Sequence, residues 1–228
     1  MMNTETIVIS LGGSLIVPDD IDVDFLKSFK ELILSQVKMG QRFILITGGG
    51  KIAREYIESA RKISDQNIEN MDWIGIAATR LNSELLRSIF GEFAYSKIIL
   101  DPDALPETNS PIILGAGWRP GNSSDSAAVH VAISSGAKRI LNLSNIDYVY
   151  DSDPKKNPDA KKIEKISWAD FIKLLPDKWD PGFNAPFDPV AAQEAKSAKL
   201  EVSILNGKNI SNLEKCLSGE SFEGTIIS

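Results

Sequence analysis

The chain has 228 residues, of which 43% are hydrophobic and 25% are charged, the balance of a globular protein with a sizeable core. Its 25 Lys and Arg against 31 Asp and Glu give a net charge of −6, which argues against a protein that coats nucleic acid. No apolar run approaches the ~18 residues that span a bilayer, and the first residues do not resemble a signal peptide, so we expect a cytoplasmic protein.

The amino-terminal half alternates short apolar runs with helical patterns. Runs that stop at turn residues predict strands over residues 6–11, 43–47, 97–100 and 111–114. Apolar residues at helical spacing predict helices over residues 26–37, 52–63 and 74–89. The order of these elements is typical of repeated strand, helix, strand units.

The carboxyl-terminal half continues the alternation. Strands are predicted over residues 139–143, 202–205 and 224–227. Helices are predicted from Ser123-Ser124-Asp125 onward, over 168–175, over 190–198 with Asp188 as cap, and through Leu213. Two longer connections remain, a polar segment over 144–158 and an excursion over 177–189 that is either a lid or a packing loop. The alternation predicts a mostly parallel sheet with helices on both faces.

Three glycine-rich turns follow predicted strands and precede predicted helices, at residues 12–14, 48–50 and 115–121. In a parallel sheet such turns share the carboxyl edge of the strands, where ligands bind. Glycine permits close backbone approach, and the following helix presents unpaired amides to an anion. The turns therefore predict a phosphate site, although none matches the P-loop motif or the complete dinucleotide fingerprint.

Single residues near these turns allow both a functional and an ordinary interpretation. Arg54, one turn into its helix, either folds back over a phosphate at Gly50 or is a surface arginine. Asp125 caps its helix, orients nearby donors, or does both. Tyr150 and Asn145 either contact a base or belong to a polar hairpin.

The one cysteine and the one histidine exclude a Cys/His zinc cluster, and Cys216 lacks a partner for an internal disulfide. We predict that His130 is structural, on an apolar helical face, and that neither residue is catalytic.

A series of motifs extends over nearly the whole chain. They are LGGSL at 11–15, GGGKIAREY at 48–56, DWIG at 72–75, PGNSSD at 120–125, NIDYVY at 145–150 with Asp153-Pro154, DPVAA at 188–192 and Gly224-Thr225. Each motif alone is loose, but their order and spacing resemble the amino acid kinase superfamily, most closely its archaeal uridylate kinase branch.

The resemblance implies a three-layer αβα sandwich in one domain, residues 1–228, with an acceptor-binding amino-terminal half and an ATP-binding carboxyl-terminal half. It implies a UMP kinase that transfers the γ-phosphoryl group of ATP to UMP, giving UDP and ADP in pyrimidine nucleotide biosynthesis. Mg²⁺ is expected on the nucleotide phosphates rather than in a cage of protein ligands. Members of the family are commonly homo-oligomers, so a hexamer or a dimer is expected.

The resemblance also implies roles for individual residues. The ATP phosphates would be held by Gly13, Ser14, Gly50 and Arg54, and the adenine nucleoside by Ser144, Asn145, Tyr150 and Asp153. UMP would be held by Gly49, Asp72, Trp118, Arg119, Pro120, Gly121, Asn122, Ser123 and Ser124. The catalytic residues would be Arg54 and Asp125, the latter matching the organising aspartate of the family.

The chain departs from the family pattern at several positions. The first strand lacks the lysine of many superfamily members, as the archaeal branch also does, and Tyr148 replaces a glycine. Trp118-Arg119 stands where the archaeal branch tends to have threonine and histidine. The added guanidinium either strengthens phosphate binding or indicates another acceptor. The alternatives are therefore a kinase of another small phosphate or carboxylate, or a nonenzymatic nucleotide-binding regulator.

Overall fold

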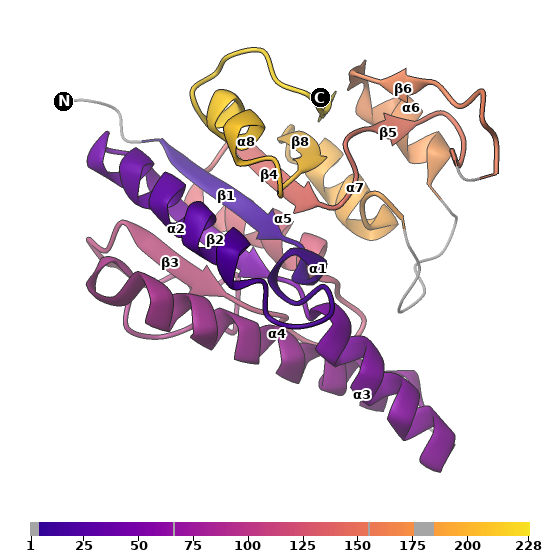
Figure 1. The fold of residues 1–228 in the computed structure, drawn as a ribbon, viewed down its shortest axis with the longest axis horizontal. Coiled ribbons are helices and arrows are strands. Elements are labelled where there is room, and N and C mark those ends of the chain that lie inside the picture. The colour runs from indigo at the N-terminus through magenta and orange to yellow at the C-terminus, as the bar shows by residue number, and fades with distance from the viewer. Residues whose placement is uncertain (1–4, 66, 155, 176–184) are drawn as a thin grey trace.

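The central strand of the sheet is β1 (Thr6–Leu11) in the computed structural model, which describes residues 5–65, 67–154, 156–175 and 185–228 (Figure 1). The sheet has 7 strands in the order β3-β2-β1-β4-β8-β9-β7. The other strands are β2 (Arg42–Thr47), β3 (Ile112–Gly115), β4 (Arg139–Ser144), β7 (Lys165–Ile166), β8 (Glu201–Asn206) and β9 (Thr225–Ile227). β3, β2, β1, β4 and β8 run parallel to one another, whereas β9 pairs antiparallel with β8.

The period-two alternation of β1 divides the interior into two apolar cores, one on each face of the sheet. Ile7, Ile9 and Leu11 pack in one core, which is covered by α1, α2, α8 and the end of α4. Val8 packs in the other core, under α5, α6 and α7. These helices are α1 (Gly13–Ile16), α2 (Val23–Lys38), α4 (Ile68–Phe90), α5 (Ser124–Ser135), α6 (Trp168–Leu174), α7 (Pro189–Ser197) and α8 (Ile210–Leu217). The predicted class, an αβα sandwich around a mostly parallel sheet, is confirmed.

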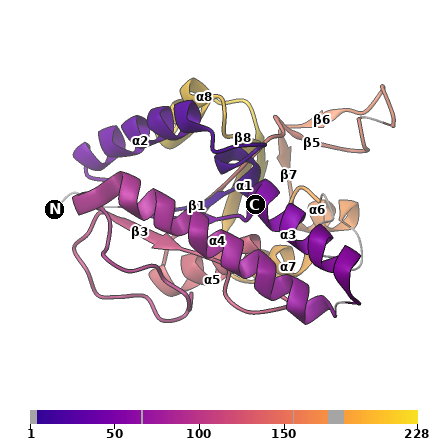
Figure 2. The same ribbon diagram turned by 60° about the horizontal axis from the view of Figure 1, so that its bottom comes forward.

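Two segments lie outside this regular arrangement. α3 (Gly50–Ile63) packs along α4 and continues beyond the body of the molecule, and of its residues only Ala53 is buried (Figure 1). β5 (Val149–Tyr150) and β6 (Lys162–Ile163) form a separate antiparallel ribbon that projects from the central sheet (Figure 2). A short 3-10 turn, η1 (Gly91–Phe93), follows α4.

The prediction of a strand over residues 97–100 is wrong. Only Ile99 makes an isolated parallel bridge, to Gly115, and Leu100 is exposed. The apolar run is followed by Asp101-Pro102, and proline supplies no amide with which a ladder could continue. Most of the predicted excursion over 177–189 lies outside the described residues, so its role as lid or packing loop stays open. Among the described residues, no helix is long and apolar enough to cross a bilayer.

Candidate active site

The first two glycine turns touch each other backbone to backbone at the carboxyl edge of β1 and β2. A Cβ atom on Gly13 would lie 2.6 Å from the carbonyl carbon of Gly48, and one on Gly48 would lie 2.5 Å from the nitrogen of Gly13. Gly50 has a φ of +67°, which residues with a side chain rarely adopt. The turn residues are therefore glycine because any larger residue would separate the two loops.

Both turns lead directly into helices, so amides without a partner in their own helix gather at this edge, although the amide of Lys51 donates to the carbonyl of Val17 at 3.1 Å. α1 begins at Gly13 and α3 begins at Gly50, and the first amides of a helix lack partners within it. Arg54 is exposed one turn into α3 and forms no salt bridge within the part of the chain that the structure describes. Its neighbour Lys51 is instead 2.8 Å from Asp19, and this hydrogen bond lowers the pKa of Asp19.

Asp125 joins the two halves of the sheet at the point where the strand order reverses. β2 and β3 lie on one side of β1, and β4 lies on the other, which is where open α/β sheets form a ligand crevice. Oδ1 of Asp125 accepts hydrogen bonds from Ser10 Oγ on β1 at 3.1 Å and from Asn142 Nδ2 on β4 at 3.0 Å. Oδ2 accepts from the backbone N–H of Asp188 at 3.2 Å.

Burial, and to a smaller extent the nearby Asp188 carboxylate, together raise the pKa of Asp125 to about 6, against the hydrogen bonds from Ser10, Asn142 and the backbone N–H of Asp188, which lower it. Asp188 itself caps α7, as predicted, since its carboxylate accepts from the amides of Val190 and Ala191. The site thus holds two adjacent carboxylates, of which Asp188 is buried and Asp125 is half-buried.

Helix α4 positions the glycine loops through a row of buried polar side chains. Asn82 Nδ2 donates to the carbonyls of Gly48 at 2.8 Å and Gly49 at 3.3 Å. The Thr79 hydroxyl accepts from the amide of Gly117 at 2.8 Å. Ser83 Oγ donates to the carbonyl of Gly115 at 2.7 Å. One helix therefore sets the orientation of both the second and the third glycine turn.

The third glycine turn is also held from outside. Asp72, at the start of α4, accepts the amide of Gly121 at 2.7 Å, and Ser123 caps α5 by accepting the amide of Ser126. Between these anchors, the guanidinium carbon of Arg119 lies 3.8 Å from the ring centre of Trp118. The segment 118–124 predicted to hold the acceptor is thus a short loop with fixed ends.

The prediction of an apolar environment for His130 is wrong. The buried residues of α5 face the sheet, but His130 lies at its edge with 24% of the side chain exposed. Its Nδ1 is 3.1 Å from the Asp103 carboxylate and its Nε2 is 3.5 Å from that of Glu194. Its ring also contacts the indole of Trp118, with centroids 5.0 Å apart.

The residues predicted to surround adenine lie in two places. Ser144 ends β4 beside the first glycine turn, because the amide of Gly12 donates to the carbonyl of Leu143 at 2.8 Å, and Asn145 follows it in an exposed position. Tyr150 belongs to the projecting β5–β6 ribbon, and Asp153 follows it. The structure therefore brings the first pair to the glycine turns and leaves the second pair on the ribbon.

Several residues of the site were not predicted as such from the sequence. Ser10, Asn142, Thr79 and Asn82 are buried polar residues, and their only signal is that each interrupts an apolar strand or helix face. The roles predicted for the other residues stay predictions, although the phosphate-turn residues, Asp72 and the 118–124 loop lie at one edge of the sheet.

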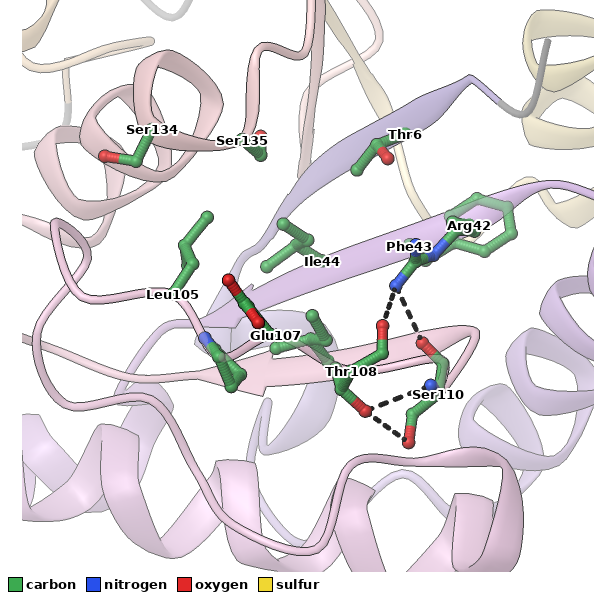
Figure 3. A pocket seen from close by; sticks show the side chains of 12 residues that line it. Thr6, Arg42, Phe43, Ile44, Leu105, Glu107, Thr108, Ser110, Ser134 and Ser135 are labelled. Atoms are coloured by element: carbon green, nitrogen blue, oxygen red, sulfur yellow. Dashed lines mark hydrogen bonds between the residues drawn. The ribbon is translucent and has the colours of Figure 1, made fainter.

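A cavity of about 280 Å³ lies at the opposite edge, near the starts of β1 and β2 (Figure 3). Arg42, which lines it, donates hydrogen bonds to the carbonyls of Thr108 and Ser110, so its guanidinium holds the 105–110 loop against β2. Nothing predicted for the site lies there. Over the residues placed by the structure, no group of three or more His, Cys, Asp or Glu side chains is arranged to hold a metal ion.

Residues 5–206 match the model of the amino acid kinase family. The uridylate kinase of Thermococcus kodakarensis is 33% identical over 227 residues, 97% of this chain and 98% of the relative. The uridylate kinase of Thermoplasma acidophilum is 34% identical, over 98% of this chain and 96% of the relative.

Solved structures of uridylate and UMP kinases are also similar to this chain. The crystal structure of uridylate kinase from Archaeoglobus fulgidus has a TM-score of 0.83 and 31% identity, over 97% of this chain and 99% of that one. A UMP kinase structure from Bacillus anthracis has a TM-score of 0.77 at 22% identity, over 98% and 96% of the two chains, which shows a common fold.

The raised pKa of Asp125 predicts a pH-dependent cost of keeping the carboxylate buried. Because the folded state binds this proton more tightly than the unfolded chain, the cost grows between pH 3.8 and about 6 and is complete above that range. Asp125→Asn has no such titration, so its free energy of unfolding should rise relative to wild type across the window by roughly 2–3 kcal/mol. Urea denaturation from about pH 4 to about pH 7 measures this, and a difference that does not change with pH would contradict it.

Asn82→Ala should destabilise the fold by about 1–3 kcal/mol, because it leaves the carbonyls of Gly48 and Gly49 without their buried donor. Ser88→Ala, at an exposed position of the same helix, is the control and should stay within about 0.5 kcal/mol of wild type. Chemical denaturation of both variants checks the prediction. Equal stabilities would show that α4 does not hold the loop through Asn82.

Proposed function

This chain belongs to the amino acid kinase family, and from that premise we propose that it is a uridylate kinase, transferring the γ-phosphoryl group of ATP to UMP to give UDP and ADP. The observation that carries the assignment is its identity of 33% to an archaeal uridylate kinase over 97% of the chain. ATP and UMP are cytoplasmic metabolites, so the proposed reaction belongs to the cytoplasm and to pyrimidine nucleotide synthesis.

The geometry of the site suits transfer between two phosphates. Phosphoryl transfer depends on positioning and on neutralising charge over the transferred group more than on covalent chemistry. The amides that begin α1 and α3 meet at one place, because Gly13 and Gly48 touch. Arg54 adds a cation that forms no salt bridge within the described residues, although, after Lys51, it contributes to lowering the pKa of Asp19. The acceptor phosphate is already an anion, so no general base is required.

The positions of the loops support a division of labour between the two nucleotides. ATP phosphates would lie on Gly13, Ser14, Gly50 and Arg54, with the nucleoside toward Ser144, Asn145, Tyr150 and Asp153. UMP would lie between Gly49, Asp72 and the segment 118–124, with the carboxylate of Asp72 available to the ribose through the oxygen that Gly121 leaves free. This division assigns the acceptor to the amino-terminal half and the nucleoside of the donor to the carboxyl-terminal half, while the phosphates of the donor reach the glycine turns of the amino-terminal half.

Mg²⁺ in this proposal is carried mainly by the phosphates of ATP, where it would neutralise charge and orient the transferred group. The site fits such an ion because its amides and Arg54 can surround phosphates, and Asp125 has both oxygens occupied by protein donors. Asp125 then acts as a positioning residue, holding Ser10, Asn142 and the start of α7 around the reacting groups.

We further propose a homo-oligomer built on the face of α3 and α4. Tyr56 on α3 and Trp73 and Leu81 on α4 are 67%, 45% and 59% exposed, and a second copy of the chain would bury these large apolar side chains. Light scattering should give a mass that is a multiple of 24.9 kDa, and a mass of 24.9 kDa at micromolar concentration would contradict the proposal.

Arg54→Ala should lower kcat/KM at least tenfold, about 1.4 kcal/mol of transition-state stabilisation, because it removes a guanidinium that stands one turn into α3, forms no salt bridge within the described residues and would bind the transferred phosphate. Lys62→Ala removes a cation from the far end of α3, where Lys62 pairs with Glu58, and should leave the kinetics unchanged. Steady-state assays of both variants decide the point, since unchanged kinetics for Arg54→Ala would remove Arg54 from the mechanism.

The function itself is tested by ADP release with ATP and Mg²⁺, offering UMP, CMP, dUMP, AMP and isopentenyl phosphate as separate acceptors. Turnover should be selective for UMP, since hydrogen-bonding sites reject analogues strongly. Selective turnover of another acceptor would make the chain a different small-phosphate kinase of this family. Binding of ATP or UMP without turnover would make it a nucleotide-binding regulator.

A further inference from the structure

Trp118 is the centre of a stack that the proposed reaction does not explain. Its indole carries the guanidinium of Arg119, whose central carbon is 3.8 Å from the ring centre. The same indole contacts the imidazole of His130 at 5.0 Å between centroids, with the planes at 59°. A tryptophan face attracts both a guanidinium and an aromatic ring, so each contact favours one orientation of the indole.

His130 is itself held from two sides. Nδ1 lies 3.1 Å from the carboxylate of Asp103, which belongs to the connection between η1 and β3. Nε2 lies 3.5 Å from the carboxylate of Glu194 on α7. The contact with Asp103 is a hydrogen bond that fixes the orientation of the ring, whereas Nε2 faces the Glu194 carboxylate without a hydrogen bond. Trp118 therefore packs against a side chain whose own position is set by α5, α7 and the 101–105 segment.

Arg119 is exposed and forms no salt bridge with any residue described in the structure. Stacking occupies the face of a guanidinium and leaves its N–H groups at the edges available, the geometry with which arginine binds phosphate oxygens. The loop that carries it is anchored on either side, at Gly117 by Thr79 and at Gly121 by Asp72. Arg119 is thus a cation held in place without a protein anion to neutralise it.

We propose that His130 is a positioning residue for the acceptor: by fixing the indole of Trp118 it holds Arg119 where the guanidinium binds the phosphate of UMP. This inference rests on the proposed function and deepens it. His130 does not touch substrate in this account. Its effect is to reduce the ordering that Arg119 would otherwise undergo when the acceptor binds.

The contacts of His130 with Trp118, Asp103 and Glu194, here called the clamp, also connect the acceptor loop to the carboxyl-terminal half. Glu194 belongs to α7, and the amide of Asp188 at the start of that helix donates to Asp125. Since Asp125 is held by β1 and β4 rather than by His130, loss of the clamp should disturb the acceptor loop much more than the phosphate turns. The expected signature is a selective effect on UMP.

The test compares His130→Ala, Arg119→Ala and the double variant in full-length protein, with UMP binding measured by calorimetry and both KM values by steady-state assay. We expect His130→Ala to raise Kd and KM for UMP about three- to tenfold, with KM for ATP within about twofold of wild type. Arg119→Ala should raise the UMP values further. The double variant should match Arg119→Ala alone, because His130 acts through Arg119.

The outcomes separate this role from the proposed function. If wild type binds UMP but His130→Ala leaves Kd and KM unchanged, or multiplies the loss in the Arg119→Ala background, the positioning role is wrong. If His130→Ala only lowers Tm, or raises KM for ATP as much as that for UMP, the residue is merely structural. If wild type neither binds nor phosphorylates UMP, the proposed function fails and this role fails with it.

Two further variants serve as a control and as a second test of the proposal. Ser134→Ala, on an exposed position of α5 away from the stack, should match wild type in all of these measurements. His130→Gln keeps a polar side chain of similar length but has no ring to pack on Trp118. It should show the same selective loss for UMP, even if His130→Ala folds poorly, and unchanged UMP binding in His130→Gln would overturn the proposal.

Discussion

The close contact between the first two glycine turns is the constraint on which the site depends. Gly13 and Gly48 approach so closely that neither has room for a Cβ atom, and Gly50 needs a positive φ to start α3 from that position. This contact places the beginnings of two helices side by side at the end of β1 and β2. Any larger residue would move the amides apart, and with them the proposed binding site for the transferred phosphate.

Polar side chains hold the site from both faces of the sheet. On one side Asn82 and its neighbours on α4 occupy the carbonyls of the glycine turns, so that the amides of the turns can face outward. On the other side Asp125 links β1, β4 and α7 across the reversal of strand order. A buried carboxylate lowers stability above its pKa, so the arrangement exchanges some stability for a fixed geometry.

The acceptor loop is organised by a different principle. Its ends are hydrogen-bonded, but its middle is held by ring contacts from Arg119 to Trp118 and from Trp118 to His130. In the sequence, Trp118-Arg119 departs from the family pattern, and the spacing predicts a structural His130 on an apolar helical face. The structure instead places His130 beside the carboxylates of Asp103 and Glu194, which are distant from it in the chain. No local pattern in the sequence indicates that these carboxylates lie near His130.

The sequence by itself determined the alternation of strands and helices, the parallel sheet, the glycine turns at its carboxyl edge and the family. These follow from local periodicity, from the conformational freedom of glycine and from motif order along the chain. It did not reveal that residues 97–100 form only a single bridge, or that Ser10, Asn142 and Asp188 converge on Asp125. Only the tertiary structure decided these, because strand order and contacts between segments that lie 17 to 115 residues apart depend on packing rather than on local sequence.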